Sequence, residues 1–159
     1  MRRLIIDSIR NDPEWKNGEY TTQPKAFRVA NVFYGIATNG GTLAYQQMAP
    51  TREAADKLLN ERLATPTGAD ANDFLYAWDA SRDYDPEPRL DRIRARVLVI
   101  NSADDERNPP ELGLMDAAMQ RVARGRAVWV PASTQTVGHA TLGSPRWWKD
   151  ELDAELAQL

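Results

Sequence analysis

The stretch VLVINSADDERNPP, residues 97–110, decides the fold predicted for this chain. It opens with Val97–Ile100, an unbroken run of β-favouring apolar residues that predicts a strand buried on both faces. A strand of that kind belongs inside a parallel sheet. Its carboxyl end leads directly into a cluster of acids, and in open α/β sheets ligands and catalytic groups gather beyond the carboxyl ends of the strands. We therefore expect an α/β fold with a functional site just after Ile100.

A second short apolar run, Ala127–Val130, predicts another strand, and the only histidine of the chain follows it. This histidine, His139, comes directly after Gly138 in a predicted loop. Because neighbouring parallel strands end at the same edge of a sheet, the two strands would bring an acid and the histidine together. The acid is either Asp104 or Asp105.

From Leu98 onward the predicted elements alternate between strand and helix, which is typical of a parallel sheet. The helix between the strands is predicted over residues 110–124, with Gly125 as its C-cap, and the last helix begins at Pro145. A pair of short strands does not make a stable parallel sheet. The strand Val97–Ile100 is therefore expected to need further strands from outside this sequence.

The first 85 residues are predicted to be almost entirely helical. Apolar spacing predicts helices over residues 2–10, over 25–48 with a break at 39–41, and over 71–81. Thr51 and Asp70 are predicted to be N-caps. We expect a domain division into a helical cap at residues 1–68 and an α/β core segment at 69–159.

Composition narrows the class of protein. The chain has 159 residues, 42% of them hydrophobic, a net charge of −3 and no cysteine. That length permits a domain with its own core, and the absent cysteine excludes disulfides, thiolate metal sites and a cysteine nucleophile. No basic stripe, membrane-length apolar run or secretory signal is present, so we expect a cytoplasmic protein that binds neither nucleic acid nor membrane.

Each candidate site residue also has a structural interpretation. A single histidine in a loop is commonly a surface or hydrogen-bonding residue, and acids after a strand commonly cap the next helix. The consecutive acids Asp104, Asp105 and Glu106 suggest a metal, but adjacent side chains diverge and only one histidine is available, so no metal is expected. Gly40–Gly41 is too short for a phosphate loop and indicates a helix break.

A resemblance strengthens the catalytic interpretation. Its parts are DANDFLYAWDASRDYD at 70–85, LDRIRARVLVI at 90–100, Asp105 with Pro109 four residues later, and Gly138–His139. In this order they resemble the C-terminal half of α/β-hydrolase-fold enzymes, in particular the homoserine O-acetyltransferase branch. Residues 1 to about 65 resemble the helical cap of that branch. The fold implied is the C-terminal part of an α/β-hydrolase, a helical cap followed by strand, helix, strand and helix.

The resemblance also implies a mechanism. In such enzymes the triad runs serine, acid, histidine along the chain. By the register of Pro109, Asp105 corresponds to the triad acid, with Asp104 as the alternative, and His139 corresponds to the general base. The implied reaction passes through an acyl-enzyme, with a small acyl ester or an acyl-CoA as substrate and no cofactor.

This chain departs from the family pattern at two points. The nucleophile motif Gly-x-Ser-x-Gly does not occur in it, so the serine is expected in an N-terminal half and the chain alone is predicted to be inactive. Its expected partner is that N-terminal half as a separate chain, or a second copy of itself. The other departure is Ala140, because the homoserine branch typically has an acid after the histidine to receive the substrate's amino group. A hydrolase, or a transferase with another acceptor, is therefore expected.

An alternative hypothesis comes from a different class. The chain would then be a non-catalytic helical binding or interaction protein that keeps the late strands only as a packing platform. A Gly-x-Ser-x-Gly stretch encoded upstream or in an adjacent reading frame separates the two hypotheses.

Overall fold

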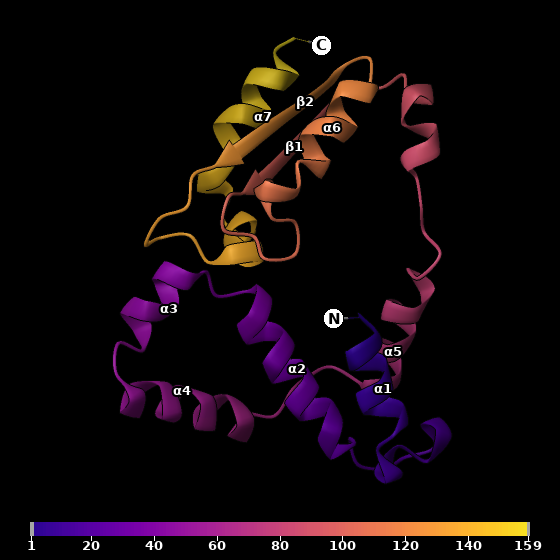
Figure 1. The fold of residues 1–159 in the computed structure, drawn as a ribbon, viewed down its shortest axis with the longest axis vertical. Helices are drawn as coiled ribbons and strands as arrows, with labels where there is room; N and C mark the ends of the chain where they lie inside the picture. Colours follow the sequence, from indigo (N-terminus) through magenta and orange to yellow (C-terminus); the bar gives the residue numbers. More distant parts are fainter. Residues whose placement is uncertain (1, 159) are drawn as a thin grey trace. The chain divides into compact units, whose positions relative to one another are not determined.

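The computed structural model describes residues 2–158, which divide into two compact units. The helical unit contains the described residues up to Ile36 together with Ala49–Tyr84, and the α/β unit contains Ala37–Met48 together with the described residues from Asp85 onward. The helices and strands of both units are labelled in Figure 1.

The helical unit packs around the apolar face of α1. It contains α1 (Arg2–Arg10), η1 (Pro13–Gly18), most of α2 (Lys25–Thr38), α4 (Arg52–Ala64) and α5 (Ala71–Ala80). Ile5 and Ile9 of α1 are buried against Leu75 of α5 because their spacing places them on one side of the helix. The other buried members of this core are Ile6, Phe27, Tyr34 and Ala71.

Polar contacts fasten the loop before α2 to the first turn of α5. Trp15 Nε1 donates to Asn72 Oδ1 at 2.8 Å, and the Tyr20 hydroxyl donates to Asp70 Oδ2 at 2.6 Å. Because α5 packs on α1, residues 71–80 lie with the helices that precede residue 68. The units seen in the structure are therefore interleaved along the chain, and the domain division at 68 and 69 stays a prediction.

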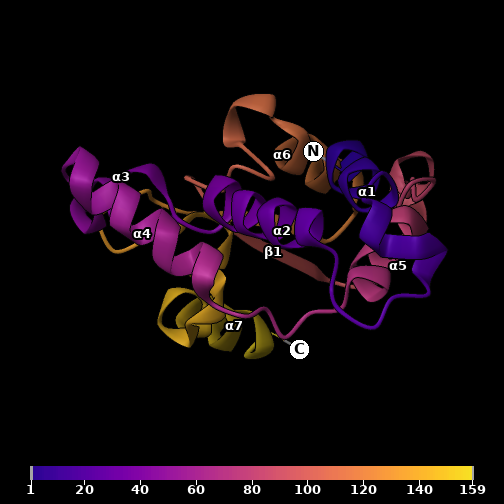
Figure 2. The same ribbon diagram turned by 90° about the horizontal axis from the view of Figure 1, so that it is seen from below.

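The α/β unit is built on a parallel strand pair. β1 (Val97–Ser102) pairs with β2 (Gly125–Val130) in a register that runs from Val97 opposite Gly125 to Ser102 opposite Val130. Helices α6 (Leu114–Arg121) and α7 (Lys149–Leu156) lie on opposite sides of this pair (Figures 1 and 2). The remaining elements are α3 (Thr42–Met48), η2 (Glu87–Arg92), η3 (Pro110–Leu112), η4 (Gly138–Gly143) and η5 (Pro145–Trp147).

Ion pairs hold α7 against the strands. Arg96, directly before β1, lies 2.7 Å from Glu155, and Arg126 of β2 lies 2.9 Å from Glu151. The predicted order of strand, helix, strand and helix is confirmed.

Two details differ from the sequence-based expectation. The segment predicted as a helix over 110–124 is broken at Gly113, whose φ of 63° is left-handed, and α6 ends at Arg121, so that Gly125 begins β2 instead of capping a helix. Val97–Ile100 is half-buried instead of fully buried, because β2 is the only strand beside it among residues 2–158.

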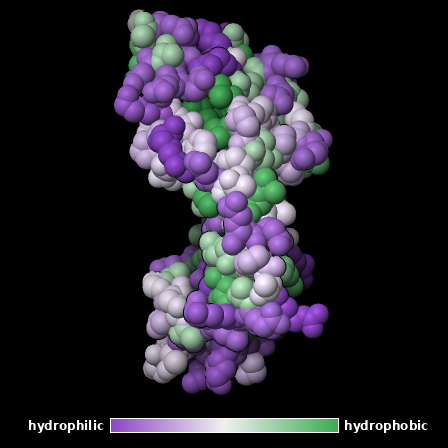
Figure 3. All heavy atoms as spheres, turned by 90° about the vertical axis from the view of Figure 1, so that its left-hand side faces the viewer, coloured by the Kyte–Doolittle hydropathy of each residue, from purple (hydrophilic) through white to green (hydrophobic). Residues whose placement is uncertain are grey.

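Apolar side chains also reach the surface. Tyr84, Leu112 and Leu114 are exposed, and Figure 3 shows hydrophobic residues among hydrophilic ones on the face that it presents. Within residues 2–158, no helix has the length and apolar character needed to cross a membrane.

Candidate active site

The acid-bearing turn follows β1 directly and is held by its own backbone. The amide of Asp105 donates to the carbonyl oxygen of Ser102 at 3.1 Å, and the amide of Asn108 donates to the carbonyl oxygen of Asp105 at 3.2 Å. The Asp105 side chain folds over the turn, where Oδ1 accepts the Arg107 amide at 2.8 Å. Aspartate favours such turns because its short side chain can accept the N–H group two residues later. The turn therefore places a buried carboxylate at the end of the strand.

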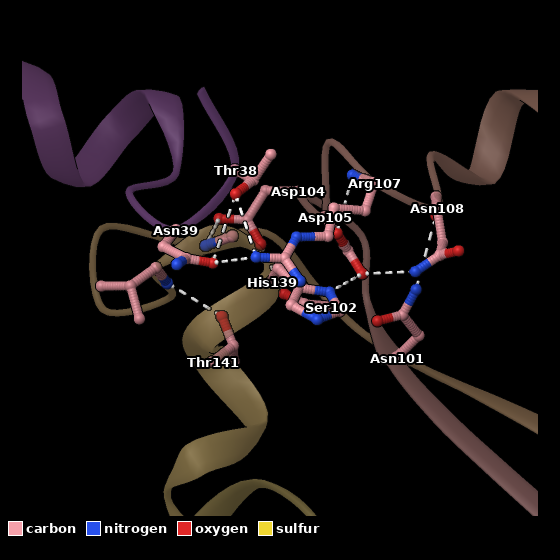
Figure 4. A network of polar contacts seen from close by, with 12 residues as sticks. Thr38, Asn39, Asn101, Ser102, Asp104, Asp105, Arg107, Asn108, His139 and Thr141 are labelled. Carbon is pink, nitrogen blue, oxygen red and sulfur yellow. Dashed lines mark hydrogen bonds and ion pairs between the residues drawn. The ribbon is translucent and has the colours of Figure 1, made fainter. Parts of the chain in front are cut away.

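The imidazole of His139 reaches this carboxylate from the segment after β2 (Figure 4). Its Nδ1 lies 2.9 Å from Asp105 Oδ2, which also accepts Asn108 Nδ2 at 3.0 Å. Since an ionised carboxylate only accepts hydrogen bonds, Nδ1 donates, and Nε2 is the acceptor nitrogen of the neutral ring. The Asp105 side chain is 0% exposed and the His139 side chain 39% exposed. A buried carboxylate thus orients an imidazole that solvent can reach.

Opposing effects set the pKa of Asp105. Burial raises this pKa, whereas hydrogen bonds from His139, Asn108 and the Arg107 amide lower it. The hydrogen bonds prevail and hold the pKa of Asp105 below its ordinary value. The carboxylate is therefore ionised at neutral pH, as it must be to stabilise a positive charge on the ring.

Asp104 faces different partners, although it is adjacent in the sequence. Its carboxylate accepts the Ser102 hydroxyl, the Thr136 hydroxyl at 2.7 Å and the Gly138 amide at 3.4 Å. Asp105 is thus the acid that contacts the imidazole, a choice that the sequence pattern alone left open. The two carboxylates diverge, and no group of three potential metal-ligating side chains occurs within the described part of the chain.

Glu106, the next acid, is perturbed in the opposite direction. Burial raises the pKa of Glu106, its own backbone hydrogen bond opposes the change, and the negative charges of Asp104 and Asp105 reinforce it. The turn therefore concentrates negative charge around one histidine.

Several polar residues of the site were not predicted from the sequence. The Arg107 guanidinium donates to Thr38 Oγ1 and to Asn39 Oδ1, both at 3.2 Å, and so links the acid turn to the end of α2 (Figure 4). These partners lie 69 and 68 residues earlier, so no local pattern indicates them. Asn108 differs, because an asparagine in the same turn as a buried aspartate is a recognisable hydrogen-bond partner.

A cavity of about 480 Å³ opens beside the imidazole, within the α/β unit. Small-molecule sites range over roughly 300–1,000 Å³ and combine apolar walls with a few polar groups. This cavity has that character, with His139, Asn101, Arg107 and Asn108 as its polar lining residues. Its apolar lining comes from Val99, Ile100, Pro109, Leu112, Leu114, Met115, Trp129 and Leu142.

The nucleophile expected of such a site is not provided by the residues that the structure describes. The hydroxyl of Ser102, the serine closest in sequence to the acids, donates to Asp104. Across residues 2–158, no hydrogen bond joins a serine hydroxyl to His139. The structure therefore brings together Asp105 and His139, two of the three groups that nucleophilic acyl transfer requires.

Comparison with known proteins shows which solved structures share the fold of this chain. No family model and no curated protein matches the sequence. The chain is similar to homoserine O-acetyltransferase from Bacillus anthracis, with a TM-score of 0.71 and 19% identity over 95% of this chain and 46% of that one. It is also similar to the acetyl esterase MekB (TM-score 0.62, 19% identity, 99% and 48% covered) and to esterase E22 (0.66, 18%, 98% and 48%).

These similarities establish the class of fold. The chain has the fold of the C-terminal part of an α/β-hydrolase, and the predicted fold class is confirmed. It spans about half the length of the structures that it matches, 46–48% of each.

Proposed function

We propose that the chain provides the acid and the base of a serine-dependent acyltransferase or esterase. The observation that supports this most strongly is the 2.9 Å hydrogen bond between Asp105 Oδ2 and His139 Nδ1, next to a mainly apolar cavity. A buried carboxylate that orients an accessible imidazole is the arrangement needed to remove a proton from an attacking hydroxyl. The solved structures with this fold include an acetyltransferase and esterases, which is consistent with acyl transfer.

The proposed reaction has two halves. In the first, His139 Nε2 takes the proton of a serine hydroxyl while the serine oxygen bonds to the acyl carbonyl carbon. Asp105 stabilises the imidazolium, which then protonates the leaving alkoxide or thiolate as the bond to the acyl group breaks. In the second half, His139 takes a proton from a water or an acceptor hydroxyl, whose oxygen bonds to the acyl carbon. The imidazolium then returns this proton to the serine oxygen as the bond between the serine and the acyl group breaks.

The substrate class follows from the cavity and from the residue after the histidine. Apolar walls suit the acyl part of a small ester or of an acyl-CoA. Ala140 offers no charge for an amino group of the acceptor. We therefore propose ester hydrolysis, or transfer to an acceptor other than homoserine.

The serine is proposed to come from residues outside this sequence, which contains no Gly-x-Ser-x-Gly motif. β1 offers the place where that segment adds to the sheet. The amides of Val97 and Ala103 donate to the carbonyl oxygens of Arg124 and Val130, on the side of β2. Because backbone groups alternate in direction along a strand, the N–H and C=O groups of Leu98 and Ile100 point to the opposite edge of β1. Additional parallel strands at that edge would pair with these groups.

The experiment pairs this chain with the polypeptide, encoded upstream or in an adjacent frame, that has the Gly-x-Ser-x-Gly motif. Hydrolysis of p-nitrophenyl acetate and acetyl transfer from acetyl-CoA are measured for the pair and for each part alone. We expect activity only in the pair, and a loss of roughly a thousandfold or more in kcat for His139→Ala and Asp105→Asn.

A matched control is Lys149→Ala, which removes an exposed side chain whose ion pair lies within α7. This variant should keep the activity of the pair. If His139→Ala were as active as the unaltered pair, the proposal would be wrong. If no such motif is encoded in the neighbourhood, the non-catalytic binding function becomes the better explanation.

A further inference from the structure

We propose that Asp104 is a positioning residue that fixes the segment bearing His139, so that adjacent acids hold the same histidine from two sides. Asp105 holds the imidazole ring, and Asp104 holds the backbone and side chains that lead up to it. This inference rests on the proposed function, since it assigns a role within the same site.

The contacts of Asp104 join two segments that are far apart in the sequence. Its Oδ1 accepts the hydroxyl of Ser102, the last residue of β1, and its Oδ2 lies 2.7 Å from the hydroxyl of Thr136 and 3.4 Å from the amide of Gly138. Ser102 and Thr136 are both 0% exposed. Hydrogen bonds to a charged group are stronger than those between neutral groups, so the carboxylate ties the end of β1 to the histidine segment, where the Thr136 hydroxyl also contacts the Ser133 backbone.

The backbone around Asp104 leaves this segment little freedom. Gly138 has a φ of 59°, and a Cβ atom there would lie 2.5 Å from Glu106 Oε2 and 3.1 Å from the Gly41 nitrogen. Gly41 has a φ of 66°, and a Cβ atom there would lie 2.6 Å from Asp104 Oδ2. Because neither glycine has a side chain, the histidine segment and the turn after α2 can lie close together with the Asp104 carboxylate beside them.

Positioning matters because the ring is only partly held by its own contact. The His139 side chain is 39% exposed, and within residues 2–158 its ring makes one hydrogen bond, to Asp105. Removing Asp104 would release the Gly138 amide, one residue before the ring, and would leave the Thr136 hydroxyl with its contacts to the Ser133 backbone, so the histidine segment would lose its connection to β1. The ring would then leave Asp105 more often, without any change in Asp105 itself.

The chain contains a single histidine, which makes a direct spectroscopic test feasible. Long-range 1H–15N NMR of the 159-residue chain reports the tautomer of His139 and the exchange rate of its Nδ1 proton. We expect Asp104→Ala to raise that exchange rate by at least about tenfold, because a hydrogen bond to a charged group contributes on that order. Thr136→Val, which removes only the hydroxyl at similar volume, should raise it in the same direction.

Controls separate this inference from the proposed function. Asp116→Ala removes an acid that is hydrogen-bonded to Trp129 instead, and should leave the exchange rate unchanged. Amide resonances of β1 and β2 verify that each variant is folded. If Asp104→Ala does not fold, Asp104→Asn, which keeps the side-chain volume, is used in its place. Asp105→Ala should abolish the protected Nδ1 proton.

The outcomes are distinct. If the folded Asp104 and Thr136 variants exchange as slowly as the unaltered chain while Asp105→Ala does not, the role of Asp104 is overturned and the proposed acid–base pair stands. If Asp105→Ala also has no effect, the pair itself is refuted.

Discussion

At the scale of single residues, Gly41 and Gly138 combine a positive φ with close packing beside the candidate site. We predict that Gly138→Ala lowers the free energy of unfolding by roughly 2–5 kcal/mol, since it combines a strained positive φ with overpacking against Glu106 and the Gly41 backbone. Urea unfolding measures this loss. Gly113→Ala tests the backbone strain alone, because the φ of Gly113 is 63° and no packing atom lies within 4 Å of the position of an added Cβ. It should cost only about 1–2 kcal/mol. A Gly138→Ala loss no larger than that of Gly113→Ala would contradict the packing described.

The lowered pKa of Asp105 predicts a pH dependence of stability. The folded-state pKa lies below the unfolded value of about 3.9, so the contribution of Asp105 is fully present above the unfolded value and is lost as pH falls through the folded pKa. The free energy of unfolding, measured against pH, should therefore fall more for the unaltered chain than for Asp105→Asn in the acid range. Parallel curves for the two proteins between pH 7 and the acid limit would show that Asp105 is not stabilised in its ionised form.

At the scale of elements, Asp70 does more than cap α5. Its Oδ1 accepts the amides of Asn72 and Asp73 at 2.8 and 3.2 Å, and its Oδ2 accepts Tyr20 and Gln23 at 2.6 and 2.7 Å. We predict that Asp70→Ala costs roughly 2 kcal/mol or more in thermal or urea unfolding. Thr51 caps α4 by accepting a single hydrogen bond from the Ala54 amide, and Thr51→Ala should cost about 1 kcal/mol. Equal losses would mean that the Tyr20 and Gln23 contacts contribute little.

Most elements were predictable because their signals are local. The apolar spacing of α1, the glycine break between α2 and α3, and the caps Thr51 and Asp70 all appear in the structure as expected. The prediction failed at Gly125, which was expected to cap a helix and instead begins β2. The apolar spacing in the sequence extends to Val122, which is buried. In the structure, however, Val122 is the C-cap of α6 and does not belong to a further helical turn.

The candidate site was predictable only in part, for a related reason. The strand ends indicated His139 with either Asp104 or Asp105, and the family resemblance, through the register of Pro109, pointed to Asp105, which the structure brings into contact with His139. Thr38, Asn39 and Thr136 join the site through tertiary contacts, and no sequence spacing encodes those. The turn geometry that sends Asp104 and Asp105 to different partners is also encoded by no spacing in the sequence.

At the scale of the whole molecule, the edge of β1 that has no strand beside it among residues 2–158 predicts self-association of the chain on its own. Leu98 and Ile100 direct backbone groups away from β2, and β1 is only half-buried. Light scattering should give a mass above the 17.9 kDa of one chain. Ile100→Pro removes an N–H group from the free edge without breaking the pairing with β2, and should reduce the association. A monodisperse, cooperatively melting monomer would contradict this prediction.

We propose that Asp105 and His139 together activate a serine supplied from outside these residues. The most direct measurement is the rate at which a fluorophosphonate labels that serine when the segment with the Gly-x-Ser-x-Gly motif is combined with this chain. We predict no labelling of the chain alone, rapid labelling of the combined protein, and labelling slower by roughly a thousandfold or more with His139→Ala. Labelling that proceeds equally fast with and without the His139 imidazole would contradict the claim.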